Sequence, residues 1–223
     1  MKSYIKTWNE SRILPVFLFF LVVILFGVLP FSKERPLIQG LVTFFLASNL
    51  VLGIYTIHTN RIVRFSTLFF SFLVVVIELL NINLGNLTLM ILAILCWIII
   101  IGLLLYVFLI KVFEQKSEGL HRIQGGIACY LLIGLLFAFI YFLVFTLFPN
   151  AFSFSDSFNS PGMHFYNFVY YSYITLCTVG FGDISPKIPI SQSASILEAI
   201  VGVLYPTVLI GYLISDFSTK RKS

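Results

Sequence analysis

The chain has 223 residues, of which 59% are hydrophobic, 17% aromatic and 10% charged, and its mean hydropathy is +1.02. A soluble fold of this size cannot bury so much apolar surface, so the composition excludes an ordinary water-soluble enzyme or binding domain and indicates a membrane protein. The net charge of +5 would suit a nucleic-acid partner. We expect none, because the basic residues cluster in short loops beside apolar segments, where they set membrane topology.

Six apolar runs are long enough to cross a hydrocarbon core of about 30 Å, which takes about 20 helical residues. These runs cover residues 13–31, 36–57, 62–80, 84–110, 127–148 and 190–214. The first run has no small-residue cleavage site, so we expect a retained helix and not a removable signal peptide. The sequence therefore predicts an all-α membrane protein with six transmembrane helices.

The basic residues predict the orientation of these helices. If the N-terminus is cytoplasmic, eleven of the 14 Lys and Arg residues fall on the inner side and three on the outer side. Because cytoplasmic loops carry the excess of Lys and Arg, we expect a multi-pass protein of the cell membrane with both termini in the cytoplasm. The loop that carries Asp183 then opens to the outside.

Two neighbouring segments between the fifth and sixth runs have a different character. The aromatic run at 165–177 is too short to span a membrane, so a re-entrant helix fits better. This run leads into the nonapeptide TLCTVGFGD, residues 175–183. An irregular backbone at membrane depth is tolerated only where it lines a cavity or is buried in protein. Gly180 and Gly182 can take positive φ, so successive carbonyls can point to one side and form a ladder of oxygens, to which Thr178 adds a hydroxyl.

The full pattern resembles the signature of tetrameric potassium channels, Thr-x-x-Thr-x-Gly-Tyr/Phe-Gly-Asp. The matching positions are Thr175, Thr178, Val179, Gly180, Phe181, Gly182 and Asp183. The resemblance is specific over 165–214 and weak over the first four helices. It implies that the carbonyls of residues 178–181 and the Thr178 hydroxyl replace the water shell of K⁺. The alternative is a glycine-rich turn between two helices.

The resemblance also implies an architecture. A four-helix bundle at 1–110 would be followed by a cytoplasmic linker at 111–126, which is either an interfacial helix or a plain basic loop. A pore domain at 127–217 would contain the outer helix 127–148, pore helix 165–177, filter 178–183 and inner helix 190–214, before a short basic cytoplasmic tail at 218–223. Four copies would form a homotetramer in the lipid bilayer.

The implied activity is passive K⁺ conduction, with no enzyme chemistry, no cofactor other than the permeant ion and no soluble ligand-binding domain. We expect a prokaryotic source. The 84–110 run contains no Lys or Arg, whereas a voltage sensor needs repeated gating charges, each contributing about 2.3 kcal/mol per 100 mV. Strong voltage gating is therefore not expected. Two alternatives remain: a carrier built on broken helices and a weakly selective cation pore.

Several residues are expected to support the filter. The resemblance implies that Tyr170 hydrogen-bonds Asp183, the alternative being ordinary aromatic packing, and that Tyr171 and Tyr173 brace the filter. Tyrosine is commoner in the family at position 181, so Phe181 lacks a hydroxyl that would tie the filter to its support. We expect the filter to inactivate more readily as a result.

The sixth run holds a candidate hinge and a candidate intramembrane acid. Gly202 has the family's spacing from Asp183, and the Pro206 ring would clash with the carbonyl of residue 202. These residues are either a gating hinge or a fixed kink with close helix packing. Glu198 lies one turn before Gly202. It could bond hydroxyls of the re-entrant helix, sense protons, or be a neutral or snorkelling structural acid.

Overall fold

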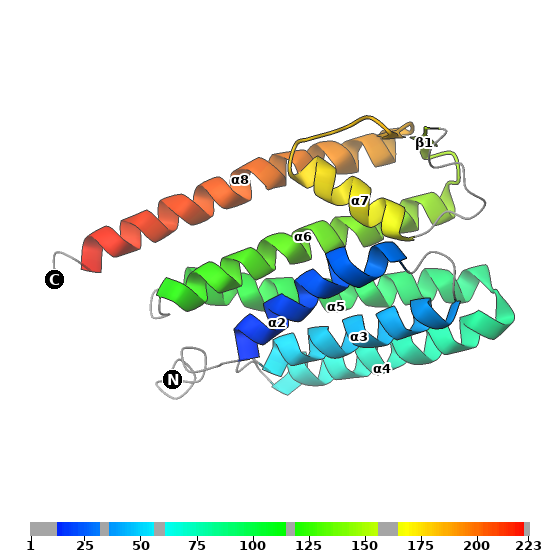
Figure 1. The fold of residues 1–223 in the computed structure, drawn as a ribbon, viewed down its shortest axis with the longest axis horizontal. Helices are drawn as coiled ribbons and strands as arrows, with labels where there is room; N and C mark the ends of the chain where they lie inside the picture. The colour runs from blue at the N-terminus through cyan, green and yellow to red at the C-terminus, as the bar shows by residue number, and fades with distance from the viewer. Residues whose placement is uncertain (1–12, 32–35, 56–60, 115–118, 156–164, 221–223) are drawn as a thin grey trace. The chain divides into compact units, whose positions relative to one another are not determined.

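The computed structural model describes residues 13–31, 36–55, 61–114, 119–155 and 165–220. The chain divides into two compact units, Met1–Cys129 and Tyr130–Ser223, and each is described by itself. Almost all described residues are helical (Figure 1). The boundary between the units lies within one helix, α6 (Gly119–Leu147), three residues after the predicted start of the pore domain.

The first unit consists of apolar helices connected in sequence. Its elements are α2 (Ile13–Val22), a π-helical turn η1 (Val23–Val28), a 3-10 turn η2 (Leu29–Phe31), α3 (Pro36–Tyr55), α4 (Arg61–Leu84) and α5 (Leu87–Phe113). The sequence between α4 and α5 sets their boundary. Gly85 has a φ of 56°, which ends α4, and the Asn86 side chain accepts a hydrogen bond from the Thr88 N–H, which caps α5.

The core of this unit consists mainly of buried Leu, Ile and Val side chains, with a few aromatic rings among them. Phe17 of α2 stacks on Phe108 of α5 with ring centroids 5.4 Å apart. Gly53 of α3 lies so close that an added Cβ would come within 2.8 Å of the Phe17 ring. Between α5 and α4, Trp97 Nε1 donates to Glu78 Oε1 at 2.9 Å. The packing of α3 against α2 therefore leaves no room for a side chain at Gly53.

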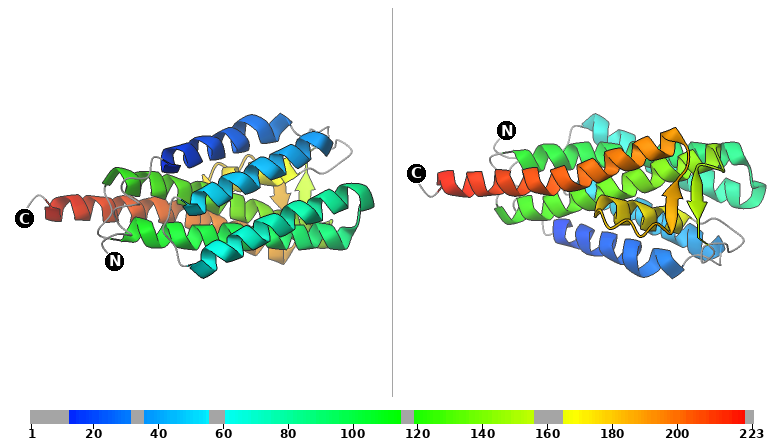
Figure 2. Two further views of the ribbon diagram at one scale, coloured as in Figure 1. Left: turned by 90° about the horizontal axis from the view of Figure 1, so that it is seen from below. Right: turned by 90° about the horizontal axis from the view of Figure 1, so that it is seen from above.

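The second unit continues α6 with β1 (Phe152–Phe154), α7 (Phe165–Leu176), β2 (Ile184–Pro186) and α8 (Pro189–Lys220). The two short strands pair antiparallel, with Ser153 opposite Ser185, and lie side by side in Figure 2. The sequence did not predict them. Aromatic rings join α7 to α6, including Phe165 with Phe139 at 4.3 Å and Tyr171 with Tyr141 at 4.9 Å.

Four of the six predicted spans are helices long and apolar enough to cross a membrane. They are Arg61–Asn81, Leu87–Phe113, Leu120–Leu147 and Pro189–Ser215. Within the described residues, the first two predicted spans contain shorter apolar helical segments, Leu14–Val28 and Phe44–Gly53. That these two segments cross the membrane remains a prediction. The described residues include four apolar helices that indicate a multi-pass membrane protein.

Helix boundaries differ from the prediction around the linker. The fifth predicted helix starts at 127, but α6 starts at Gly119 and runs on without a break, and α5 extends to Phe113. Residues 114–118 are therefore all that separates two long helices, and most of the predicted linker is helical. The predicted tail at 218–223 lies partly in α8 and partly outside the described residues.

Candidate functional site

The candidate site begins where α7 ends. The Thr178 N–H donates to the Thr175 carbonyl at 2.9 Å, and the N–H groups of Val179 and Gly180 both donate to the Ile174 carbonyl, at 2.8 and 3.2 Å. A helix leaves its last carbonyls without intrahelical partners, and here the following segment supplies the donors. The start of the 178–183 segment is therefore fixed to the last turn of α7.

The backbone of this segment alternates in handedness. Thr178, Gly180 and Gly182 have φ values of 59°, 53° and 79°, whereas Val179 and Phe181 are not in the positive-φ region. The sequence predicted positive φ at the two glycines and missed Thr178. A β-branched residue rarely adopts this conformation, and such strain costs about 1–3 kcal/mol and concentrates at functional sites. The alternation is the backbone geometry that lets successive carbonyls face the same way.

The 178–183 segment lies at the surface of a single chain. The side chains of Val179 and Phe181 are 52% and 69% exposed. A Cβ added to Gly180 or Gly182 would meet nothing within 4 Å. Backbone oxygens are the groups by which this segment could hold a monovalent cation. Among the described residues, no group of three or more His, Cys, Asp or Glu side chains could hold a metal.

The far end of the segment is fixed by Asp183. Its Oδ2 accepts a 2.6 Å hydrogen bond from the Tyr170 hydroxyl, so the predicted contact is present. Oδ1 accepts from the Ile184 N–H at 3.0 Å, and the Asp183 carbonyl accepts from the Ser155 N–H at 2.9 Å. The Tyr170 hydroxyl is the donor in this contact, because a carboxylate can only accept.

The strands β1 and β2 also fix the far end of the 178–183 segment. Directly after the segment, β2 pairs with β1. The Ala151 carbonyl, next to β1, accepts from the Lys187 N–H and from Ser191 Oγ, both at 2.8 Å. The 178–183 segment is thus held between α7 on one side and the β1–β2 pair on the other.

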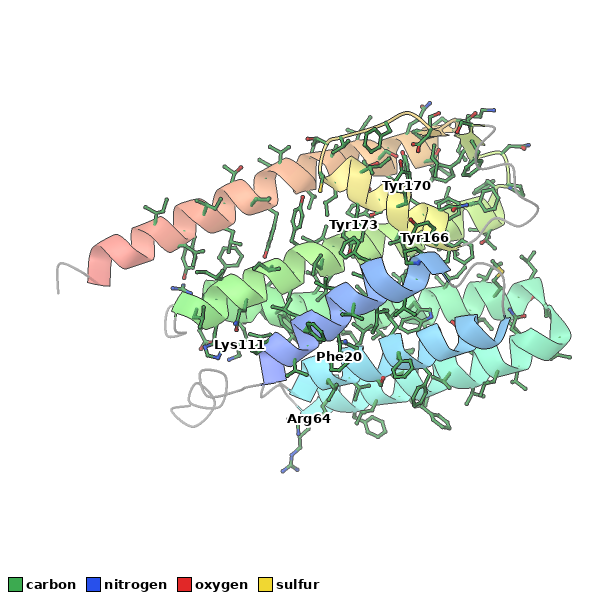
Figure 3. The ribbon with its side chains drawn as sticks, in the orientation of Figure 1. Phe20, Arg64, Lys111, Tyr166, Tyr170 and Tyr173 are labelled. Carbon is green, nitrogen blue, oxygen red and sulfur yellow. The ribbon has the colours of Figure 1, made fainter. Side chains whose placement is uncertain are left out.

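A second set of contacts holds α7 against α6. The Tyr173 hydroxyl donates to the Leu131 carbonyl at 2.7 Å, and a Cβ on Gly134 would come within 2.5 Å of the Tyr173 ring. Tyr130 donates to the Leu176 carbonyl at 3.3 Å. Tyr170 and Tyr173 both project from α7 in Figure 3. The sequence named Tyr173 as a brace but missed Tyr130 and Gly134. A glycine within an apolar helix was the available signal, because small residues mark close helix contacts.

Gly202 lies at a close contact between α8 and α7. A Cβ at this position would lie 2.0 Å from the Leu176 carbonyl oxygen. Pro206 is inside α8, which continues unbroken to Lys220. One residue further, Thr207 Oγ1 donates to the Val203 carbonyl at 2.7 Å. Of the two interpretations of Gly202, this geometry directly supports close packing, and a hinge remains a proposal.

Glu198 is fully buried between three helices. Tyr141 of α6 bonds its Oε2 at 2.6 Å, and Ser172 of α7 bonds its Oε1 at 2.5 Å. Ser172 Oγ also lies 2.6 Å from the Gly134 carbonyl. A bond to a hydroxyl of α7 was one of the alternatives for Glu198, and it is observed. The contact with Tyr141 was missed because it joins positions 57 residues apart.

Part of the chain matches the model of a known protein family. Residues 129–219 match the model of a protein family described as ion channel. The matched range runs from Cys129 in α6 through α7, the 178–183 segment and nearly all of α8. This part of the chain is therefore similar to ion channels, which supports passive ion conduction. No curated protein and no solved structure gives a significant match.

Proposed function

We propose that four copies of this chain form a potassium-selective channel, in which the 178–183 segments surround a central ion path. The observation that carries this proposal is the alternating handedness at Thr178, Gly180 and Gly182 within a complete filter-type motif. The carbonyls of residues 178–181 would replace the water shell of K⁺, with the Thr178 hydroxyl at the inner end. The match of residues 129–219 to ion channels supports the same function.

Selectivity requires that the carbonyls keep their spacing when the ion changes. The segment is tied to the Ile174 and Thr175 carbonyls at its start and to Tyr170 and Ser155 at its end. These contacts oppose collapse of the ring around the smaller Na⁺. They support a selective pore over a weakly selective one.

A single chain supplies one strand of carbonyls, and a ring around an ion needs several. The exposure of Val179 and Phe181 in one chain leaves this strand accessible to other copies. Apolar residues also line the exposed surface of α8: Ile196, Leu197, Ile200, Val203, Leu204 and Val208. Closed cyclic assemblies of identical chains are common, and a homotetramer satisfies both features.

The proposed channel conducts K⁺ down its gradient without strong voltage gating. The long apolar helix α5 carries its only basic residue, Lys111, in its last turn. A charge at the end of a helix crosses little of the membrane field, so α5 would contribute little gating energy. A carrier would be expected to have interrupted helices in two related halves, whereas the irregular backbone of the 178–183 segment lies in the second unit.

Bi-ionic recordings in planar bilayers test this function. With K⁺ on one side and Na⁺ on the other, we expect a reversal potential of at least about 59 mV, which corresponds to tenfold selectivity for a monovalent ion. A clearly smaller value would favour a weakly selective pore, and the absence of unitary current steps would favour a carrier. Either result would reject the proposal.

A pair of glycine variants sharpens the experiment. Gly182→Ala and Gly102→Ala both add a methyl group where nothing lies within 4 Å, but only Gly182 has positive φ. An L-residue in the left-handed region costs about 1–2 kcal/mol. We therefore expect Gly182→Ala to reduce K⁺ selectivity and Gly102→Ala to leave it unchanged. Equal behaviour of the two variants would contradict the assigned backbone role.

A further inference from the structure

The buried carboxyl of Glu198 lies in a chain of oxygen atoms that joins α6, α7 and α8. The chain runs from Tyr141 Oη to Glu198 Oε2, from Glu198 Oε1 to Ser172 Oγ, and from Ser172 Oγ to the Gly134 carbonyl. Its three oxygen–oxygen distances are 2.6, 2.5 and 2.6 Å. At such distances each pair of oxygens needs a shared hydrogen, because two bare acceptors would repel each other.

The hydroxyl groups do not supply enough hydrogens for these contacts. Tyr141 and Ser172 each carry one hydroxyl hydrogen, and the Gly134 carbonyl carries none. Two hydrogens cannot form three short, near-linear hydrogen bonds. If Ser172 donates to an ionised Glu198, its 2.6 Å contact with the Gly134 carbonyl has no hydrogen. A proton on the Glu198 carboxyl supplies the third hydrogen, so that each of the three contacts has one.

The surroundings of Glu198 also disfavour a charge. The titratable side chains that face it are the phenols of Tyr130 and Tyr141 on α6 and of Tyr171 and Tyr173 on α7. Among the described residues, the structure gives Glu198 no Lys, Arg or His partner. A buried carboxylate without a cation costs far more free energy than a hydrogen-bonded neutral acid.

We propose that Glu198 is a neutral carboxylic acid that acts as a positioning residue for the proposed filter. Its O–H donates to Ser172 Oγ, Ser172 donates to the Gly134 carbonyl, and Tyr141 donates to Glu198 Oε2. The acid thereby links α8 to α6 and α7 at once. One donor and one acceptor on the same side chain are required, which a carboxylate cannot provide.

The contacts of Glu198 reach the part of α7 that directly precedes the 178–183 segment. Ser172 lies about one turn before the end of α7, and Thr178 follows that end. One turn beyond Glu198, Gly202 contacts the Leu176 carbonyl. The inner helix therefore holds α7 at two places, so a movement of α8 is transmitted to the backbone that precedes the filter. This part of the inference rests on the proposed function.

Infrared difference spectroscopy of reconstituted protein tests the protonation state. Subtracting the spectrum of Glu198→Gln from that of the wild type at neutral pH should leave the carbonyl band of a protonated carboxylic acid. Tyr141→Phe should shift this band to higher frequency, because it removes the hydrogen bond to the carbonyl oxygen. A difference spectrum with carboxylate bands and no acid band would overturn the inference. This readout does not depend on ion selectivity, so it can fail or succeed separately from the proposed function.

Recordings of the same variants test the positioning role. Glu198→Gln keeps one donor and one acceptor, so its K⁺ over Na⁺ permeability ratio and inactivation rate should stay within about twofold of the wild type. Glu198→Ala and Ser172→Ala leave buried groups without partners, and the inactivation rate should rise about tenfold. Ser66→Ala in α4, whose hydroxyl donates to the Ile62 carbonyl of the same helix, is the control. Wild-type behaviour of both Glu198→Ala and Ser172→Ala would overturn the positioning role, as would a Glu198→Gln channel as impaired as Glu198→Ala.

Discussion

At Thr178 the backbone has a φ of 59°, in a region that glycine would occupy without strain. The chain nevertheless has threonine there, at a cost of about 1–3 kcal/mol. The hydroxyl is what glycine could not supply, and it lies at the inner end of the proposed filter. The anchoring bonds of the segment to Thr175 and Ile174 hold this strained conformation in place.

Tyr170→Phe removes the hydroxyl that donates to Asp183 at 2.6 Å. A hydrogen bond to a charged group contributes about 1.5–3 kcal/mol, so we expect the current to inactivate about tenfold faster under sustained opening, since about 1.4 kcal/mol corresponds to tenfold in rate. Single-channel or ensemble recordings measure this rate. Tyr106→Phe, at an exposed position of α5, is the matched control. Equal rates in the two variants would mean that the contact does not stabilise the conducting state.

Phe181→Tyr tests the departure from the commoner family residue. The Phe181 ring is exposed in one chain, so a partner for the added hydroxyl is expected from a neighbouring copy. A neutral hydrogen bond contributes about 0.5–1.5 kcal/mol, and inactivation should slow about 2- to 10-fold. An unchanged inactivation rate would count against this role.

At the residue scale, the sequence predicted backbone conformations and a hydrogen bond in and next to the 175–183 motif. The positive φ at Gly180 and Gly182 and the bond between Tyr170 and Asp183 follow from local patterns and family spacing, and both are present. Tyr141 and Gly134 were missed. Their roles depend on which faces of separate helices meet, and this information is not contained in either helix alone.

The pore helix candidate α7 is short, and contacts with neighbouring elements fix its position. Its 12 residues extend about 18 Å at 1.5 Å per residue, well short of a membrane span. Side chains from α6, α8 and the segment after it bond or pack against it: Tyr130, Tyr141, Glu198 and Asp183. We therefore expect substitutions at these contacts to affect the 178–183 segment even though most of them lie outside it.

Gly202→Ala tests close packing between α8 and α7. The added Cβ would lie 2.0 Å from the Leu176 carbonyl oxygen, whereas a Cβ at Gly211 on the same helix meets nothing within 4 Å. Overpacking costs about 1–3 kcal/mol, so Gly202→Ala should lower the thermal stability of the purified protein. Gly211→Ala should preserve or raise it, because alanine favours helix by up to about 1 kcal/mol.

The same pair of variants distinguishes packing from a hinge. A hinge at Gly202 predicts a changed open probability with no loss of stability. If both variants melt at the same temperature and differ only in open probability, the packing account is wrong.

At the element scale, the apolar runs predicted where helices occur, and four of the six are long enough to span a membrane in the described residues. They did not predict the short strands or the start of α6. The aromatic run at 165–177 became α7 at Phe165–Leu176, and the sixth run became α8. The strands β1 and β2 have three residues each, too few for a periodic signal. The start of α6 at Gly119 was missed because a charged, glycine-containing stretch resembles a linker even where it is helical.

For the whole molecule, each chain is expected to contribute one of four equivalent strands to the ion path. The first unit has an apolar α5 whose single basic residue, Lys111, is in its last turn. The sequence alone could predict that residues 84–110 carry no Lys or Arg, since this needs only a count. The sequence could not predict how the four-helix bundles would be arranged around the proposed pore, because that arrangement depends on contacts between copies.

The most direct measurement of the central claim is a cryo-electron microscopy map of the reconstituted protein, recorded in K⁺ and again with Na⁺ as the only cation. In K⁺ we expect four copies around one axis, with ion density between the carbonyl rings of Thr178, Val179, Gly180 and Phe181. In Na⁺ this density should weaken or the rings should distort. A monomer, or a tetramer whose 178–183 segments face lipid and hold no ion in K⁺, would contradict the account.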